Sequence, residues 1–352
     1  MTEILFILKR REDYSAKIHS EKGLSTGLFN SATFVCDMLN YEGIESALEV
    51  AIDNNCIDRL VTLHKPRVVI IEALWVVPSK FYELSKLHPG VTWVIRLHSD
   101  MPFMATEGIS LDWIGNYAAH PNIVLAPNSP RMYDEVKIYL KAKHWEWTKE
   151  EIDNKIVYLP NFYPIETTQK KFNRDKHWID IGCFGAVRPL KNHVMQAISS
   201  LQFAEDINKE LRFHINIGRV EGRGEPTLHN LQGLFENLTH KGHKLIGHEW
   251  APHNEFMNVC KKMDIGMQVS FSETFNIVGA DMISSGVPFI GSRGEIPWGI
   301  KFFSADPQSS KSIIKALHRA YWLPELNVVW HRHNIHNYSN RTIKIWTKYF
   351  RG

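Results

Sequence analysis

The sequence predicts an α/β protein of two Rossmann-like, doubly wound domains, and three observations support this prediction. The chain of 352 residues is longer than the roughly 250 to 300 residues at which single cores stop growing. Short apolar runs alternate with helical patterns, which is typical of a parallel sheet covered by helices. The alternation stops once near the middle of the chain and then restarts. Two such domains in tandem imply a cleft between them.

Five apolar runs in the first half predict buried parallel strands, because such strands are apolar on both faces. They cover residues 3–9, 67–75, 92–98, 122–127 and 155–160. Between them, residues 30–43 and 129–143 carry apolar side chains at spacings of three and four, which predicts helices. We therefore expect an N-terminal domain over residues 1–163.

A polar stretch without periodicity, residues 164–178, is typical of an interdomain linker. The strand and helix patterns then resume, and a second domain is expected over residues 179–321. Its strands are predicted at residues 179–185, 212–218, 243–250, 264–270 and 287–292. Aromatic residues at helical intervals predict one or two helices over residues 322–352.

Composition excludes several classes of protein. Hydrophobic residues make up 44% and charged residues 22% of the chain, which is ordinary for a soluble globular protein. No apolar run approaches the roughly 18 to 20 residues of a membrane span, and the first residues lack the order of a secretory signal. The four cysteines form no C-x-x-C pair, so neither a disulfide framework nor a zinc site is indicated. We expect a cytoplasmic protein without integral membrane contact.

Ligands of open α/β sheets bind beyond the carboxyl ends of the strands, so the loops at those ends are the first candidates. In "GCFGAVRPLKNH", Gly185 ends a predicted strand, and Arg188 and Lys191 precede a helix that starts near Asn192. Glycine permits close approach, arginine binds phosphate with two hydrogen bonds, and lysine adds a point charge. The loop is either a diphosphate site or a basic surface loop.

The stretch "SFSETFNIVGADMISSGVP", residues 270–288, ends a strand and begins a predicted helix that Gly286 terminates. The first amides of that helix should bind phosphate or sugar oxygens. They are the amides of Thr274, Phe275 and Asn276. Glu273 would repel phosphate, so it either caps the helix or accepts hydrogen bonds from neutral hydroxyls. Asp281 is either exposed to solvent or the partner of a diol such as ribose.

The first half contributes two candidates. His98 ends the strand "TWVIRLH" and is either a structural histidine or a group for sugar contact and proton transfer. The turn before the first helix is a possible lining of the same cleft, through Gly23, Ser25, Thr26 and Gly27. The glycines do not form G-x-G-x-x-G, so the nicotinamide fingerprint is absent.

No dedicated metal site is expected. The histidines within residues 240–248 and 331–336 have metal-like spacing, but no matching set of carboxylates or cysteines accompanies them.

Four passages, in this order along the chain, resemble the retaining GT-B glycosyltransferases that carry an E-x-x-x-x-x-x-x-E motif, a glycosyltransferase family 4-like group. "VIRLHSD" is similar to the strand that ends in the family's active-site histidine, and "IVYLPNFYP" to its "V-I-P-N-G-V-D" passage. "FGAVRPLKNH" resembles "G-R-L-x-x-x-K-G". "SFSETFNIVGADMISSGVPFIGS" resembles "S-x-x-E-G-F-G-x-x-x-L-E-A-M-A-x-G-x-P-V-V-x-S".

The resemblance implies two domains facing a central cleft, with the C-terminal helix or helices packing back on the N-terminal domain. The first domain would bind the acceptor and the second a nucleotide-diphosphate sugar, whose sugar is transferred with retention. No cofactor or metal would be required, because protein cations neutralise the leaving diphosphate.

The resemblance also implies roles for single residues. Arg188 and Lys191 would bind the diphosphate, with Gly185 beside them. Glu273 would bind hydroxyls of the sugar, Asp281 the ribose, and His98 the sugar near its anomeric carbon. Two positions depart from the pattern: Asp281 is one methylene shorter than the usual glutamate, and Asn276 replaces a glycine.

The acceptor stays open at the level of sequence. The run "WVIRLHSDMPFMATEGISLDWI" resembles compact phage-encoded glycosyltransferases, some of which modify hydroxymethylated bases in phage DNA within the host cytoplasm. DNA would need phosphate contacts, for which Lys9, Arg10, Arg11, Lys17 and Lys22 are candidates. A saccharide or lipid-linked acceptor needs none. A non-catalytic sugar-nucleotide-binding protein and a sugar-nucleotide epimerase are alternatives of other classes.

Overall fold

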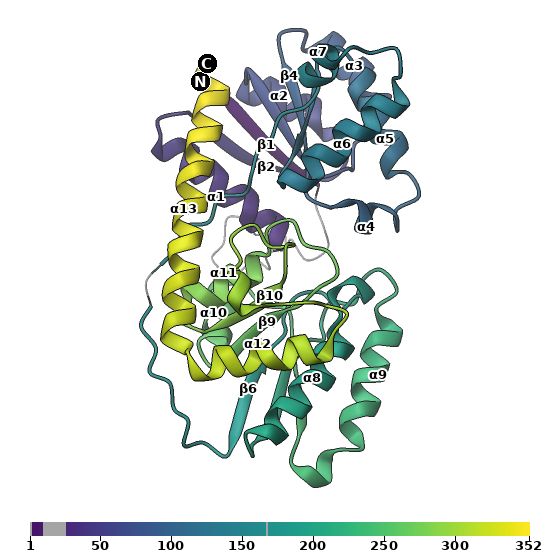
Figure 1. Cartoon of the computed structure of the whole chain (residues 1–352). Helices are drawn as coiled ribbons and strands as arrows, with labels where there is room; N and C mark the ends of the chain where they lie inside the picture. Colours follow the sequence, from purple (N-terminus) through teal and green to yellow (C-terminus); the bar gives the residue numbers. More distant parts are fainter. Residues whose placement is uncertain (1, 10–25, 167) are drawn as a thin grey trace. The chain divides into compact units, whose positions relative to one another are not determined.

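The computed structural model describes residues 2–9, 26–166 and 168–352. Gly23, Ser25 and four of the basic residues considered for DNA contact lie outside this range: Arg10, Arg11, Lys17 and Lys22. The chain divides into two compact units (Figure 1). The first comprises residues 1–164 and 339–352, and the second comprises residues 165–338.

The first unit contains a five-stranded sheet in the order β2-β1-β3-β4-β5, with every pair of neighbours parallel. The strands are β1 (Ile4–Lys9), β2 (Ser46–Ala51), β3 (Val68–Glu72), β4 (Thr92–Leu97) and β5 (Ile123–Pro127). The helices are α1 (Gly27–Tyr41), α2 (Cys56–His64), α3 (Lys80–Leu87), α4 (Met101–Met104), α5 (Ser110–Ala119), α6 (Pro130–Lys143) and α7 (Lys149–Asn154).

Side chains on alternate positions of these strands enter two separate cores. Leu5 and Ile7 belong to a core on one face of the sheet, whereas Ile4 and Phe6 belong to a core on the other. The second core also contains Trp346 from the end of α13 (Pro324–Arg351). Burial on both faces explains why these strands are continuous apolar runs in the sequence.

The strand predicted at residues 155–160 is wrong as a strand, because Ile156 forms only an isolated bridge with Leu125. The strand β2 was not predicted. Its residues are only partly buried except Ala51, and it lies at the edge of the sheet. An edge strand with polar positions gives no apolar run, so the sequence carries little signal for it.

The second unit contains a six-stranded parallel sheet in the order β11-β10-β9-β6-β7-β8. The strands are β6 (Trp178–Gly182), β7 (Glu210–Asn216), β8 (Lys244–His248), β9 (Ile265–Gln268), β10 (Phe289–Ser292) and β11 (Ser304–Ala305). The α-helices before α13 are α8 (His193–Asp206), α9 (Glu225–Glu236), α10 (His253–Cys260), α11 (Ile277–Ser284) and α12 (Ser310–Trp322). The prediction of two Rossmann-like α/β domains is confirmed.

Two glycines let α11 lie close to the centre of this sheet. Gly182 on β6 is paired in register with Gly266 on β9. A Cβ at Gly182 would lie 2.8 Å from Met282 Cε, and one at Gly266 would lie 2.6 Å from Met282 Cγ. A larger residue at either position would have to displace Met282 of α11.

No helix in the described parts of the chain is both long enough and apolar enough to cross a bilayer.

Candidate active site

The loop after β6 is tied to the neighbouring strand at its first turn. Gly185 has a φ of +105°, a conformation that favours glycine. Its amide donates to Asn216 Oδ1 at the end of β7, over 2.8 Å. The predicted glycine therefore sets the path of the chain toward the two cations that follow it.

The loop after β6 that carries Arg188 and Lys191, called the cation loop, is hydrogen-bonded to the carboxyl end of β9. Lys191 closes a 3₁₀ turn, Pro189–Lys191, that directly precedes α8. Gln196 donates from Nε2 to the carbonyl of Lys191 over 2.7 Å and accepts from the amide of Val269 over 2.7 Å. Asn192 also donates to the carbonyl of Val269, over 3.1 Å. These buried side chains hold the loops after β6 and β9 in a fixed relation.

Arg188 lies beside a short bridge to the loop after β7. Val187 pairs with Val220 there, and Arg188 Nη1 lies 3.9 Å from Glu221 Oε2. Arg188 is partly exposed, so its charge faces solvent as well as this carboxylate.

Lys191 and Glu273 meet directly. Lys191 Nζ donates to Glu273 Oε1, and only 13% of the lysine and 8% of the glutamate side chain is exposed. The amide of Glu273 donates to Glu295 Oε2 over 3.2 Å. The structure thus joins two residues predicted for one ligand from loops that follow different strands.

The predicted start of the helix at Thr274 is wrong, because α11 begins at Ile277. Asn276 is the cap of the helix and has a φ of 65°, so the chain turns sharply there. Thr274 and Phe275 precede the helix, and the Phe275 side chain is buried beside Trp298. The amides of these residues are therefore not the first amides of the helix. Glu273 does not cap the helix either.

The contacts of Asn276 explain how an asparagine can stand where the resembling sequences have a glycine. Asparagine tolerates the left-handed conformation better than most residues. Its Oδ1 accepts from the amide of Gly279 over 2.7 Å, and its Nδ2 donates to Gln268 Oε1 over 3.3 Å. The asparagine therefore keeps the backbone turn and adds a cap that glycine lacks.

Asp281 is buried, with 2% of its side chain exposed, which contradicts the solvent-facing alternative. Its Oδ1 accepts from His253 Nε2 over 2.9 Å. Burial would lower the pKa of His253, but the hydrogen bond and charge of Asp281 raise it above its usual value. Sequence reasoning missed His253. Its position at the start of the helix after β8 was the available signal.

In the first unit, His98 directly follows β4 and hydrogen-bonds a buried carboxylate at the end of β3. His98 Nε2 pairs with Glu72 Oε2, and Arg96 Nη1 donates to Glu72 Oε1 over 3.1 Å. Burial acts to raise the pKa of Glu72, but Arg96 and His98 lower it overall. Burial also lowers the pKa of His98, against the influence of Glu72. The imidazole is thus held by an ionised partner.

Two asparagines extend this network at the same sheet edge. Asn161 Oδ1 accepts from Arg96 Nη2 over 2.6 Å, and Asn128 Nδ2 lies 3.3 Å from His98 Nδ1. Ala73, next to Glu72, has a φ of 70°, which is unfavourable for alanine and common near functional groups. Sequence reasoning missed Glu72, Arg96 and Asn128; Asn161 lay within the passage "LPNFYP".

The predicted turn before α1 lies partly within the described residues. Thr26 is the cap of α1 and accepts from the amide of Phe29 over 3.3 Å, and Gly27 is the first residue of that helix. Helix capping accounts for Thr26, and a role in ligand binding stays a prediction for it and for Gly27.

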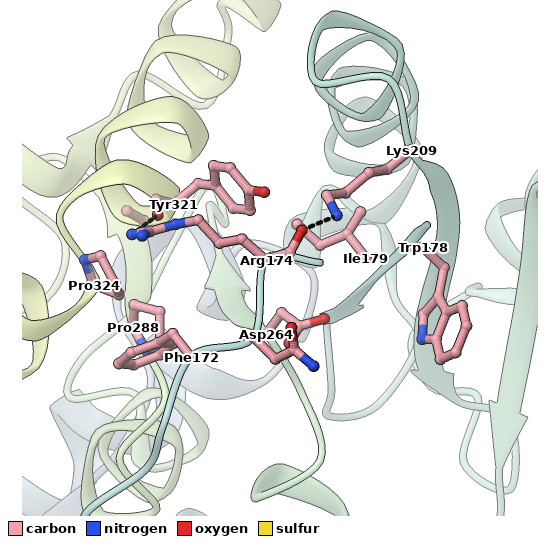
Figure 2. Close-up of a pocket in the computed structure, with 11 residues that line it drawn as sticks. Phe172, Arg174, Trp178, Ile179, Lys209, Asp264, Pro288, Tyr321 and Pro324 are labelled. Carbon is pink, nitrogen blue, oxygen red and sulfur yellow. Dashed lines mark hydrogen bonds between the residues drawn. The ribbon is translucent and has the colours of Figure 1, made fainter. Parts of the chain in front are cut away.

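A pocket lies at the opposite edge of the second sheet, at the amino ends of its strands (Figure 2). It lies around Trp178, Asp264 and Pro288, where β6, β9 and β10 begin. Its cations hold the connecting segment. Arg174 donates to the carbonyl of Tyr321 over 3.1 Å, and Lys209 donates to that of Arg174 over 2.6 Å (Figure 2). These bonds favour a structural role, so we place the ligand site at the carboxyl edge.

Within the described ranges, no three or more histidine, cysteine, aspartate or glutamate side chains are grouped so that they could hold a metal ion.

The fold is similar to that of several solved proteins. Sucrose-phosphate synthase from Thermosynechococcus elongatus superposes with a TM-score of 0.65 at 10% identity, covering 99% of this chain and 98% of that one. An α,α-trehalose-phosphate synthase (UDP-forming) from Burkholderia vietnamiensis gives a TM-score of 0.61 at 9% identity, covering 99% and 98%.

A third similar structure is a mutant of S. aureus TarM in complex with fondaparinux, alpha-GlcNAc-glycerol and UDP. It gives a TM-score of 0.59 at 14% identity, covering 84% of this chain and 58% of that one. No protein-family model matches the sequence, and no curated protein matches it significantly. The likeness therefore establishes the two-domain fold, and activity has to be argued from the site.

Two replacements of Asn276 should separate the contribution of the left-handed turn to stability from the contribution of the helix cap. We expect Asn276→Ala to lower the free energy of unfolding by about 2 to 3 kcal/mol, because alanine pays for the left-handed turn and also loses the cap. Asn276→Gly should cost less than about 1 kcal/mol, because glycine keeps the turn. Urea unfolding followed by circular dichroism measures both. Equal losses in the two variants would show that the backbone turn contributes nothing.

Replacing Glu72 should show how much stability is lost when the buried Arg96 has no anionic partner. We expect Glu72→Gln to lower the free energy of unfolding by about 3 kcal/mol, because Arg96 would stay fully buried without an anionic partner. The control is Glu49→Gln, which removes a partly exposed carboxylate that pairs with His64 over 2.9 Å and should cost about 0 to 1 kcal/mol. Chemical denaturation of both variants tests this, and a loss at Glu72 no larger than at Glu49 would contradict it.

Proposed function

We propose that this protein is a glycosyltransferase that moves a sugar from a nucleotide-diphosphate sugar to an acceptor hydroxyl, with retention of anomeric configuration. The observation that carries the proposal is the contact between Lys191 and Glu273 at the carboxyl edge of the second sheet. A cation suited to a diphosphate lies there beside a carboxylate suited to sugar hydroxyls. The fold shared with sucrose-phosphate and trehalose-phosphate synthases supports it.

The second unit binds the donor in this proposal. Arg188 and Lys191 bind the diphosphate, since both follow the glycine turn at Gly185 and precede α8. Glu273 accepts hydrogen bonds from the sugar hydroxyls. When Lys191 binds the diphosphate, Glu273 loses its hydrogen bond to Lys191 and accepts hydrogen bonds from the sugar hydroxyls instead.

The chemical step needs little beyond these charges. The bond between the anomeric carbon and the diphosphate oxygen breaks, and Arg188 and Lys191 stabilise the charge that develops on the leaving group. The acceptor oxygen attacks from the face that the diphosphate leaves, and its proton passes to a phosphate oxygen. No enzyme nucleophile takes part. Protein cations perform the neutralisation that a metal would otherwise supply.

In this proposal, His98 of the first unit hydrogen-bonds a sugar hydroxyl. The ring is held at Nε2 by Glu72, whose carboxylate is in turn fixed by Arg96. An imidazole whose pKa is lowered by burial stays neutral near pH 7. A neutral, oriented ring suits a hydrogen bond to a sugar hydroxyl better than it suits the binding of phosphate.

For the acceptor, we propose a saccharide or sugar phosphate. Two proteins of similar structure, a sucrose-phosphate synthase and a trehalose-phosphate synthase, are by name enzymes that make sugar phosphates. A hydroxymethylated DNA base is the alternative that the test below includes.

The proposal is tested by the release of nucleoside diphosphate. The full chain is incubated with UDP-, GDP- and ADP-sugars, alone and with glucose 6-phosphate, fructose 6-phosphate or hydroxymethylated duplex DNA. We expect release with one donor that increases at least tenfold with a sugar phosphate, and a product that keeps the donor's anomeric configuration by NMR. An increase with the DNA alone would assign the acceptor to the alternative. Absence of release with every donor and acceptor would contradict a transferase.

Lys191→Ala should lower turnover by about 100-fold or more, with a smaller effect on donor affinity, because the lysine stabilises charge that develops only as the diphosphate leaves. Lys241→Ala is the matched control, since Lys241 pairs with Glu205 on the surface over 2.9 Å and should leave turnover unchanged. Steady-state rates and isothermal titration with the nucleoside diphosphate separate the two effects. Wild-type turnover with weaker donor binding would remove Lys191 from the chemical step.

A further inference from the structure

Asp281 lies at the position where the resemblance implies a diol-binding carboxylate, but its side chain is not exposed to a ligand. It lies in the middle of α11 with 2% of its side chain exposed, and its Oδ1 accepts from His253 Nε2. A carboxylate this deeply buried can offer both oxygens to a diol only if whatever covers it moves away. His253 is the member of the pair that reaches the surface, with 28% of its side chain exposed.

His253 is also placed where a ligand of this sheet binds. It is the first residue of α10, which follows β8, so it lies beyond the carboxyl end of a strand. Asp281 comes from the helix that follows β9. Two helices from one sheet edge therefore contribute one hydrogen-bonded pair.

The hydrogen bond to Asp281 fixes the orientation of the imidazole, because the carboxylate accepts the proton of Nε2. A ribose hydroxyl both donates and accepts hydrogen bonds, so the oriented ring suits it whether the imidazole is neutral or charged. The imidazole also extends the reach of a carboxylate that is one methylene shorter than glutamate.

We propose that His253 contacts the ribose hydroxyls of the bound nucleotide, and that Asp281 is the positioning residue that orients it. This inference rests on the proposed function, since it concerns the donor's nucleotide. It assigns the direct contact to a histidine that the family resemblance does not include.

The loops next to His253 fit the remainder of a nucleotide. Arg219 lies over the ring of Trp250 at 4.8 Å, three residues before His253. A Cβ at Gly218 would lie 3.0 Å from the amide of Trp250, so the loops after β7 and β8 are in contact. An aromatic ring beside a guanidinium is a suitable surface for stacking a base.

The test compares ribose with its deoxy forms on the full chain. Isothermal titration first identifies which of UDP, GDP and ADP binds, and the 2′-deoxy and 2′,3′-dideoxy forms of that nucleotide follow. We expect the wild type to prefer the ribonucleotide over the dideoxy form by about 3- to 10-fold for the lost hydrogen bond. His253→Ala and Asp281→Asn should each reduce this preference to about one, and the double variant should show no further change.

His318→Ala is the matched control. His318 pairs with Asp206 over 3.1 Å in the same unit, with side chains 32% and 36% exposed, and it should keep the preference. Circular dichroism and thermal unfolding verify that the variants fold; His253, the more exposed residue, decides the outcome if Asp281→Asn is unstable.

Three results would overturn the proposals, and they differ. Binding of none of the nucleotides to the wild type would remove the proposed donor itself. Binding with an unchanged ribose preference in His253→Ala would remove only the role of His253. Loss of the preference in folded Asp281→Asn, with the preference kept in His253→Ala, would assign the ribose to the aspartate directly.

Discussion

The close contact between α11 and the sheet of the second unit determines where the polar groups around this helix lie. Met282 packs against β6 and β9 at the two positions where Gly182 and Gly266 carry no side chain. Because α11 is only eight residues long, its depth on the sheet also fixes its first turn and the loop that carries Glu273. The same depth buries Asp281, the neighbour of Met282. The two glycines thus allow the close approach of α11 to the sheet at which Asp281 is buried.

At the carboxyl edges of both sheets, oppositely charged side chains lie in pairs. Glu273 accepts from Lys191 in the second unit, and Glu72 accepts from Arg96 in the first. Pairing offsets part of the cost of removing each charge from water, whereas a single buried charge would be strongly unfavourable. The two pairs differ in burial. Glu72 and Arg96 are completely buried, whereas Lys191 and Glu273 keep some exposure to solvent.

The sequence predicts the sheets well because a parallel strand covered on both faces must be apolar along its length. It predicts the cation loop because glycine, arginine and lysine are local signals. It fails at the start of α11, because the left-handed backbone of Asn276 leaves no trace in the residue pattern. It also fails for the pairs between Glu72 and Arg96 and between His253 and Asp281. Their members are 24 and 28 residues apart, and only the strand order brings them together.

The aspartate at position 281 shows why a role cannot be carried over from one matched position alone. A glutamate there would extend one methylene further from a helix whose depth is fixed by the sheet. The aspartate ends short of the surface, and the imidazole of His253 occupies the space in front of it. Asp281 and His253 come from two helices and form one hydrogen-bonded pair, so a role for either residue has to be argued for both.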